Sequence, residues 1–172
     1  MGLSYLVFNT SLGWVGVIGS PEGLRRLTLP QASPEQVWRV FDESNSKWRD
    51  PVLSEAQADY FGDLPQRIRD YLDGKRVNFA DKLDLGRASS FQRKAWKTTQ
   101  SIPYGETRSY AWVAGEVGLP RAARGVGQAM ARNPLPLVIP CHRVVGSDGS
   151  LVGFGGGIEL KRRLLRIESG AR

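Results

Sequence analysis

Short apolar runs alternate with glycine- and serine-containing breaks over the first thirty or so positions of the chain. The runs occupy residues 5–8, 14–18 and 24–29. Short apolar runs that are bounded by turn residues are typical of strands joined by tight connections. We therefore predict a three-stranded antiparallel sheet, built as a meander, at the start of the chain.

A helix start follows the predicted sheet. Ser33 can cap a helix whose first position is Pro34, and Gln36 lies three residues after the cap, at the spacing of a capping box. We predict that this helix runs toward Phe41. Residues 45–51 carry several polar side chains and end in proline, so we predict a loop there.

Two further helices are predicted on either side of a connector. Apolar residues share one helical face over residues 64–72, and Gly74 stands where such a helix would end. Residues 75–87 are interpreted as a connector. Ser89 and Gln92 can then form a second capping box. The inner face of the helix that they begin would include Phe91, Ala95 and Trp96.

The region after the turn at 103–105 has the pattern of a helix-turn-helix. We predict short helices over residues 109–117 and 121–132, separated by the Gly-Leu-Pro break at 118–120. In such a motif the second helix contacts DNA. This part of the chain is therefore a candidate nucleic-acid interface.

The remaining pattern completes a prediction of α/β fold class. Residues 137–139 form an apolar run after two prolines, which predicts a short buried strand. A final amphipathic helix is predicted over residues 158–167. We expect a small N-terminal domain of antiparallel sheet and helices over residues 1–87, and a mainly helical C-terminal domain over residues 88–172.

The charge is distributed unevenly between these two parts. Residues 1–87 carry 11 basic and 12 acidic side chains, whereas residues 88–172 carry 13 and 5. An excess of positive charge in one part of a chain favours a polyanionic partner, although a basic surface is often merely solvated. No apolar stretch approaches the roughly 20 residues of a membrane helix, and the N-terminus has no pattern of a secretory leader. We expect a cytoplasmic protein that does not interact with membranes.

Cys141 is the only cysteine and His142 the only histidine, and they are adjacent. One cysteine cannot form an internal disulfide or supply the thiolate set of a structural zinc site. Most cysteines are inert packing residues, but positive charge from the neighbouring His142 and Arg143 would lower the pKa of this thiol and favour the nucleophilic thiolate. Cys141 is therefore the candidate nucleophile.

His142 is the candidate base, with two questions open. In a regular strand the two neighbouring side chains would point to opposite faces, so proton transfer would need a bend or an intervening water. A catalytic histidine also needs an orienting acceptor. Spacing alone does not choose among the acidic residues of the C-terminal part, which are Glu106, Glu116, Asp148, Glu159 and Glu168.

A glycine-rich segment over residues 153–157 is the remaining unusual feature. No Gly-Lys-Ser/Thr sequence follows it, so a phosphate-binding loop is disfavoured. It is either an ordinary turn or a loop whose backbone approaches a flat ligand closely, with Phe154 available for stacking.

Residues 139–145, Ile-Pro-Cys-His-Arg-Val-Val, resemble the active-site signature of the O6-alkylguanine-DNA alkyltransferases. The resemblance covers residue 89 to the end, and the N-terminal part shares only its length and its sheet-then-helix pattern. Further residues match that family in order and spacing: 103–107, Ser109, Tyr110, 121–127, Met130, Asn133, Pro134, Gly153, Phe154, Gly156, Gly157 and Lys161.

The resemblance implies a role for each matching residue of the reaction centre. Cys141 resembles the alkyl acceptor, and His142 resembles the base that acts on it through a water molecule, oriented by Glu168. Tyr110 resembles the tyrosine whose hydroxyl meets guanine N3 as the base leaves. Asn133 resembles the asparagine that joins the recognition helix to the active-site turn.

The resemblance also implies how double-stranded DNA with an alkylated guanine is bound. Arg124 resembles the arginine that fills the gap left by the flipped nucleotide, in a minor-groove complex. The other residues with implied DNA or base contacts are Arg121, Ser147 and Lys161 near the phosphates or the rim of the base pocket, and Met130, Val144, Phe154 and Gly155 in the pocket itself.

Two departures from the family pattern matter. Phe154 stands where members often have tyrosine, which removes a hydroxyl near the base. Residues 1–87 contain neither cysteine nor histidine, so the N-terminal zinc site of some animal members is excluded. We expect a monomer that needs no cofactor or metal and transfers one alkyl group irreversibly to itself.

Three other functions would fit parts of this pattern. Some relatives sense alkylated DNA without repairing it, but they have another residue, commonly tryptophan, in place of the acceptor cysteine. A transcription regulator would use the helix-turn-helix with a merely structural cysteine. A Cys-His hydrolase would turn over many times.

Overall fold

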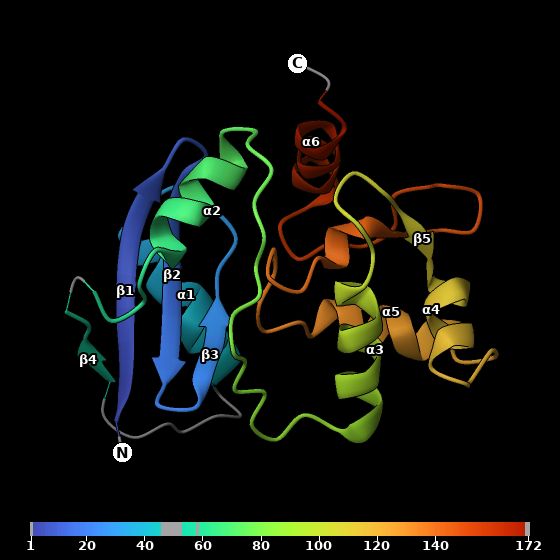
Figure 1. Ribbon diagram of the computed structural model, residues 1–172, viewed down its shortest axis with the longest axis horizontal. Coiled ribbons are helices and arrows are strands. Elements are labelled where there is room, and N and C mark those ends of the chain that lie inside the picture. Colours follow the sequence, from blue (N-terminus) through green and yellow to red (C-terminus); the bar gives the residue numbers. More distant parts are fainter. Residues whose placement is uncertain (1, 46–52, 58, 171–172) are drawn as a thin grey trace. The chain divides into compact units, whose positions relative to one another are not determined.

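The computed structural model describes residues 2–45, 53–57 and 59–170, which fold as two compact units, Met1–Gly86 and Arg87–Arg172 (Figure 1). Each unit has its own sheet and its own helices. Within the described residues, no helix is long and apolar enough to span a membrane.

The first unit is built on a four-stranded sheet with the strand order β3-β2-β1-β4. Strands β1 (Leu3–Thr10), β2 (Gly13–Ser20) and β3 (Gly23–Leu27) pair antiparallel, as the apolar runs predict. The fourth strand, β4 (Leu53–Glu55), pairs parallel with β1 and makes the sheet mixed. Sequence reasoning missed β4 because it is three residues long and two of them are exposed polar residues.

Two helices belong to the same unit (Figure 1). Helix α1 (Pro34–Asn45) begins at the predicted cap, where Ser33 Oγ accepts from Gln36 N, and it extends beyond Phe41. A Cβ atom on Gly16 would lie 2.4 Å from a methyl carbon of Val37, so glycine at this position of β2 allows α1 to lie close. Apart from Asn45, which ends α1, the predicted loop at 45–51 lies outside the described residues.

The remainder of this unit follows the predicted order. Helix α2 (Leu64–Leu72) buries Leu64, Ile68, Tyr71 and Leu72, and Gly74 follows it with a φ of 94°. The connector has no helix, and Leu83 forms an isolated bridge with Leu24 of β3.

The second unit has four α-helices and a two-stranded parallel sheet within its described residues. Helix α3 (Ser90–Gln100) begins with the predicted capping box, in which Ser89 and Gln92 bond each other's backbone N–H groups. Helices α4 (Tyr110–Glu116) and α5 (Ala123–Ala131) form the predicted helix-turn-helix, and α6 (Ile158–Ser169) is the last helix. Strands β5 (Arg108–Ser109) and β6 (Val144–Val145) were not predicted, because two-residue strands leave no periodicity.

The strand predicted over residues 137–139 is wrong, although these residues are buried as expected. The chain turns at Leu137, which has a φ of 74°, and Pro136 forms an isolated bridge with Ile139. A left-handed backbone at a leucine cannot belong to a regular strand. The turn leads into η1 (Cys141–Arg143), one turn of 3₁₀ helix that carries the candidate nucleophile.

Candidate active site

Cys141 is held by the backbone turn that precedes it. Its N–H donates to Ile139 O at 2.7 Å, and the same oxygen accepts from Asn133 Nδ2 at 2.8 Å. Asn133 follows the last turn of α5, and its Oδ1 accepts from Leu135 N at 2.9 Å. Asn133 therefore connects the end of α5, the second helix of the helix-turn-helix, with the turn that leads to Cys141.

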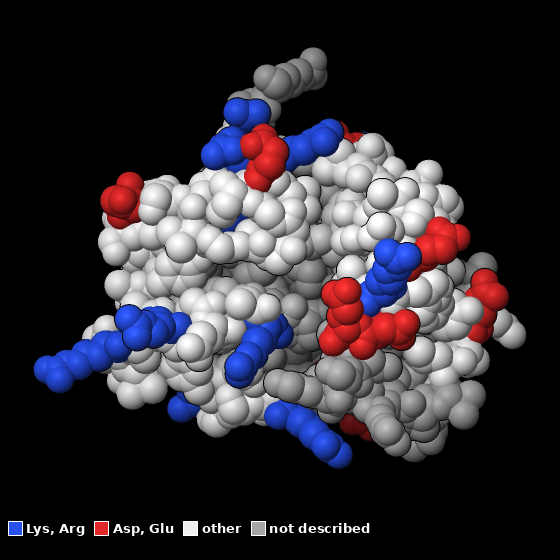
Figure 2. All heavy atoms as spheres, turned by 180° about the vertical axis from the view of Figure 1, so that it is seen from behind, with Lys and Arg blue, Asp and Glu red and all other residues white. Residues whose placement is uncertain are grey.

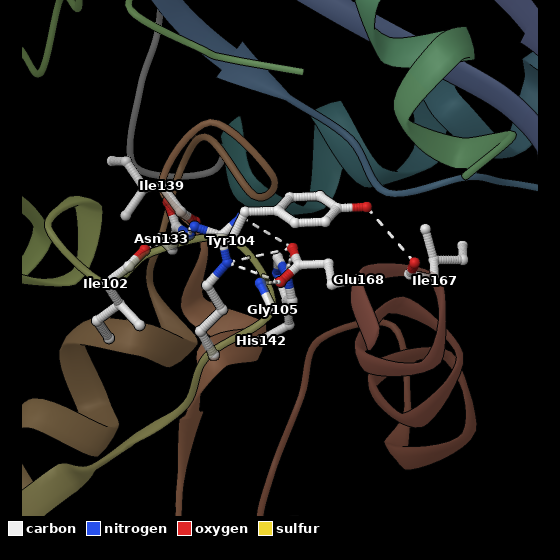
Figure 3. Close-up of polar contacts among 9 residues, drawn as sticks. Ile102, Tyr104, Gly105, Asn133, Ile139, His142, Ile167 and Glu168 are labelled. Atoms are coloured by element: carbon white, nitrogen blue, oxygen red, sulfur yellow. Dashed lines mark hydrogen bonds and ion pairs between the residues drawn. The ribbon is translucent and has the colours of Figure 1, made fainter. Parts of the chain in front are cut away.

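His142 and Glu168 form a fully buried pair. His142 Nε2 lies 2.6 Å from Glu168 Oε1, and both side chains are 0% exposed. An ionised carboxylate only accepts hydrogen bonds, so Nε2 carries the hydrogen and Nδ1 is the basic ring nitrogen. Of the five acidic candidates for the orienting acceptor, the structure brings Glu168 to His142, from the last turn of α6 (Figure 3).

Three further groups surround the Glu168 carboxylate. Arg143 Nε lies 2.9 Å from Oε2, Arg143 Nη2 lies 2.9 Å from Oε1, and Gly105 N lies 3.1 Å from Oε2. Arg143 Nη1 also donates to Ile102 O at 2.7 Å. Figure 3 shows Tyr104 beside this cluster, and its hydroxyl donates to Ile167 O at 3.4 Å.

The electrostatics of the thiol differ from the prediction. Burial raises the pKa of Cys141 above its ordinary value, while a hydrogen bond from Asn133 and the charge of Lys161 act in the opposite direction. Arg143, which was expected to lower this pKa, is directed to Glu168 instead. Burial also lowers the pKa of His142, against the effect of Glu168. Both shifts favour the neutral forms of the resting thiol and imidazole, and the expectation that neighbouring positive charge lowers the pKa of Cys141 below its ordinary value is wrong.

Lys161 is fully buried, whereas the resemblance placed it at the rim of the pocket or near the phosphates. Its Nζ donates to Val144 O at 2.7 Å and to Val152 O at 3.2 Å, and it lies 3.4 Å from the Tyr110 hydroxyl. Within the described part of the chain no carboxylate pairs with this ammonium group. Burial lowers its pKa, and the Cys141 thiol, as it becomes charged, opposes that effect.

Tyr110 lies at the first position of α4, and its hydroxyl donates to Val152 O at 2.9 Å. Burial raises the pKa of Tyr110, and so does the charge that Cys141 can carry. Because Val152 O also accepts from Lys161 Nζ, this one carbonyl joins Tyr110 and Lys161 to the loop that precedes Gly153.

The candidate base-pocket residues differ in their surroundings. Met130 and Val144 are buried, and Met130 Sδ lies 3.5 Å from Thr99 Oγ1 of α3. Phe154 is half-buried and Gly155 is exposed, in a turn where Phe154 O accepts from Gly157 N at 2.9 Å. That turn leads directly into α6, so the glycine-rich segment is the turn before this helix.

The candidate DNA-contacting residues Arg121, Arg124 and Ser147 lie outside the buried network. All three of these side chains are exposed. Arg124 lies in the first turn of α5, Arg121 lies in the turn before that helix, and Ser147 lies in the turn after β6. None of the three contributes a hydrogen bond to the network around Cys141 within the described residues. Figure 2 shows that basic side chains project from several separate places on the face that it draws, not from a single patch.

Sequence reasoning missed the groups that hold Glu168 and α5. The segments 103–107 and 139–145, which match the family, contain Tyr104, Gly105 and Arg143, so their place in these segments indicated a functional role. No sequence pattern connects them with a glutamate near the C-terminus. Trp96 Nε1 also donates to Ala129 O at 2.9 Å, tying α3 to α5. Among the described residues, no group of three or more histidine, cysteine, aspartate or glutamate side chains is arranged to hold a metal ion.

Comparison with known proteins places this site in a family. A family model described as "6-O-methylguanine DNA methyltransferase, DNA binding domain" matches residues 90–170. The chain is 46% identical over 167 residues to the methylated-DNA–protein-cysteine methyltransferase of Mycobacterium tuberculosis, covering 96% of this chain and 92% of that protein. This chain belongs to the methylated-DNA–protein-cysteine methyltransferases. The constitutive enzyme of Bacillus subtilis is 37% identical over 165 residues, covering 95% of this chain and 94% of that protein.

Solved structures of methylated-DNA–protein-cysteine methyltransferases share the fold. The crystal structure of Mycobacterium tuberculosis OGT in complex with DNA has a TM-score of 0.79 at 34% identity, covering 98% of this chain and 94% of that chain. The O6-methylguanine-DNA methyltransferase of Pyrococcus kodakaraensis has a TM-score of 0.75 at 29% identity, covering 96% and 98%. Both the family resemblance and the fold class predicted from the sequence are confirmed.

Proposed function

We propose that this protein repairs DNA by transferring the alkyl group of O6-alkylguanine, such as a methyl group, to Cys141. The observation that carries the proposal is the buried Cys141 beside the His142–Glu168 pair, in a chain whose relatives are methylated-DNA–protein-cysteine methyltransferases. The same chemistry would extend to O4-alkylthymine if the pocket accepts that base.

The reaction begins with a proton. His142 Nδ1 takes the thiol proton of Cys141 through a water molecule, because its other ring nitrogen is bonded to Glu168. The resulting thiolate attacks the alkyl carbon, a carbon–sulfur bond forms, and the bond from that carbon to O6 breaks. Guanine leaves with the electron pair of the broken bond.

The leaving guanine needs a proton, and the Tyr110 hydroxyl is the donor that we propose for its N3. In the resting structure this hydroxyl is bonded to Val152 O and lies 3.4 Å from the Lys161 ammonium group. A base that enters the pocket would compete for the hydroxyl hydrogen, and the charge of Lys161 would stabilise the oxygen as the proton leaves. Lys161 thereby takes an electrostatic role in place of a phosphate contact.

DNA binding is assigned to the second unit, residues 88–172 in the division expected from the sequence. We propose that α5 enters the minor groove, that Arg124 occupies the space of the flipped nucleotide, and that Arg121 and Ser147 contact phosphates. Met130, Val144, Phe154 and Gly155 would line the base pocket, and Asn133 would hold α5 and the Cys141 turn in register. The protein would act as a cytoplasmic monomer without a cofactor.

The stoichiometry tests this function. The chain has one cysteine, and a thioether resists hydrolysis, so each molecule should react once. A fixed amount of protein is mixed with increasing amounts of duplex that carries one radiolabelled O6-methylguanine. We expect label on the protein to reach a plateau at one methyl group per molecule, and none on Cys141→Ala. Product that keeps accumulating, or label retained by Cys141→Ala, would contradict the proposal.

A further inference from the structure

The Glu168 carboxylate is shared between the histidine and an arginine. Its Oε1 lies 2.6 Å from His142 Nε2 and 2.9 Å from Arg143 Nη2, and its Oε2 lies 2.9 Å from Arg143 Nε. The Glu168 side chain is 0% exposed and that of Arg143 only 11% exposed. Two parallel bonds from one guanidinium to both carboxylate oxygens fix the orientation of the carboxylate as well as its charge.

Such a pair changes what the carboxylate does to the histidine. A buried carboxylate with no other cation would attract a second proton to the imidazole or take up a proton itself. In the first case His142 becomes an imidazolium, and in the second a protonated Glu168 can donate to Nε2, so that the ring hydrogen moves to Nδ1. In both cases Nδ1 loses the lone pair that has to accept the thiol proton.

The other groups around the ring do not replace this charge. Within the described part of the chain, Glu168 and Lys161 of α6 and Arg143 of η1 act electrostatically on His142, and the titratable Cys141 adjoins it in η1. The buried residues of α3, which also packs on η1, are Ala95, Trp96 and Thr99, and none of them titrates. Lys161 bonds to neutral oxygens instead of to Glu168.

We propose that Arg143 is a positioning residue for alkyl transfer, which holds and neutralises the Glu168 carboxylate so that His142 stays a neutral imidazole with its hydrogen on Nε2. The inference rests on the proposed function and concerns its proton-transfer step. A purely structural role is the alternative, because Arg143 also bonds to Ile102 O and its guanidinium carbon lies 5.7 Å from the centre of the Tyr104 ring.

The protonation state of His142 distinguishes the two roles. Because the chain has one histidine, ¹⁵N-histidine labelling gives a spectrum with signals from a single imidazole. The spectrum is recorded across a pH series for the wild type, Arg143→Gln and Arg143→Lys. Arg162→Gln is a matched control, since it makes the same change at an exposed arginine of α6 that pairs with Glu159. Single-turnover methyl transfer from O6-methylguanine duplex is measured over the same pH range.

We expect the wild type, Arg143→Lys and Arg162→Gln to hold a neutral ring with hydrogen on Nε2 at neutral pH. In Arg143→Gln the ring should instead be doubly protonated or carry its hydrogen on Nδ1. Where the ring is doubly protonated, the rise of the transfer rate with pH should begin at higher pH than in the wild type. For each pH unit of that displacement, the rate on the acid side of the profile should be about tenfold lower. Where the hydrogen has moved to Nδ1, the rate should fall at every pH.

An Arg143→Gln ring with the wild-type tautomer and titration would overturn the proposal, even if transfer were slower. If Arg143→Gln does not fold, as judged by its near-ultraviolet circular dichroism, Arg143→Lys decides. A lysine keeps the charge, so a changed tautomer in that variant would also overturn the proposal. Failure of the wild type to transfer a methyl group would contradict the proposed function, whereas the histidine spectra, recorded without DNA, would still test the role of Arg143.

Discussion

Replacing Asn133 by alanine should lower the stability of the second unit, because the side-chain amide of Asn133 makes hydrogen bonds with two backbone groups. Asn133 Oδ1 accepts from Leu135 N, and Nδ2 donates to Ile139 O. Ile139 O keeps a second donor, the N–H of Cys141. Leu135 is fully buried, so its N–H would lose its hydrogen bond in a place that bulk water does not reach.

The cost follows from these two bonds. A net hydrogen bond contributes about 1 kcal/mol, and a buried N–H without a partner costs about 1–3 kcal/mol. We therefore expect Asn133→Ala to lower the free energy of unfolding by about 2–4 kcal/mol. Since each 1.4 kcal/mol is about tenfold, this is roughly a 30- to 1000-fold change in the unfolding equilibrium.

Urea unfolding combined with amide hydrogen exchange measures this effect. Asn78→Ala is the matched control, because Asn78 lies in the connector with its side chain outside the core, and its replacement should change stability by no more than about 0.5 kcal/mol. In Asn133→Ala the Leu135 amide should exchange much faster than in the wild type. A loss below about 1 kcal/mol, together with an unchanged Leu135 exchange rate, would refute the reasoning.

Three further predictions concern the chemistry and the turn at Gly105. Lys161→Met should raise the pKa of Cys141 further, because the ammonium charge of Lys161 lowers that pKa in the wild type. Methyl transfer by the variant should therefore be slower near neutral pH and recover as the pH rises. A single-turnover pH series checks this, and a profile identical to that of the wild type would contradict it. Since burial raises the thiol pKa of the wild type, its rate should also increase from neutral toward alkaline pH, and a flat profile would count against that cause. Gly105→Ala should lower the free energy of unfolding, measured in urea, by about 1–3 kcal/mol. Gly105 has a φ of 80°, and a Cβ atom there would lie 3.1 Å from Glu168 O. An unchanged free energy of unfolding would contradict the claim that a side chain is strained at this position.

Local patterns predicted most helices and three strands, because caps and periodicity are properties of neighbouring residues. The capping residues Ser33 and Ser89 act as their spacing indicates. Strand β4 was missed, and the turn at Leu137 was mistaken for a strand, because both depend on residues that are distant in sequence. A three-residue edge strand exists because β1 offers it a partner, and a leucine adopts a φ of 74° only where the surrounding packing holds it there.

The site was predictable by resemblance but not by local pattern. Glu168 lies 26 residues from His142 in sequence, so only the fold or a known family can select it from five acidic residues. Charge reasoning about neighbours in sequence gave the wrong direction for the Cys141 pKa, because it left out burial and because Arg143 turns toward Glu168. The burial of Lys161 was not predicted either, because lysine side chains are rarely buried in proteins.

Intact-protein mass spectrometry after incubation with a duplex carrying one O6-methylguanine tests the central claim most directly. We expect every active molecule to gain the mass of one CH₂ group, and peptide mapping to locate it on Cys141. Cys141→Ala should gain nothing under the same conditions. An unmodified wild-type protein that nevertheless binds the lesion duplex preferentially would contradict alkyl transfer and indicate a sensor of alkylated DNA.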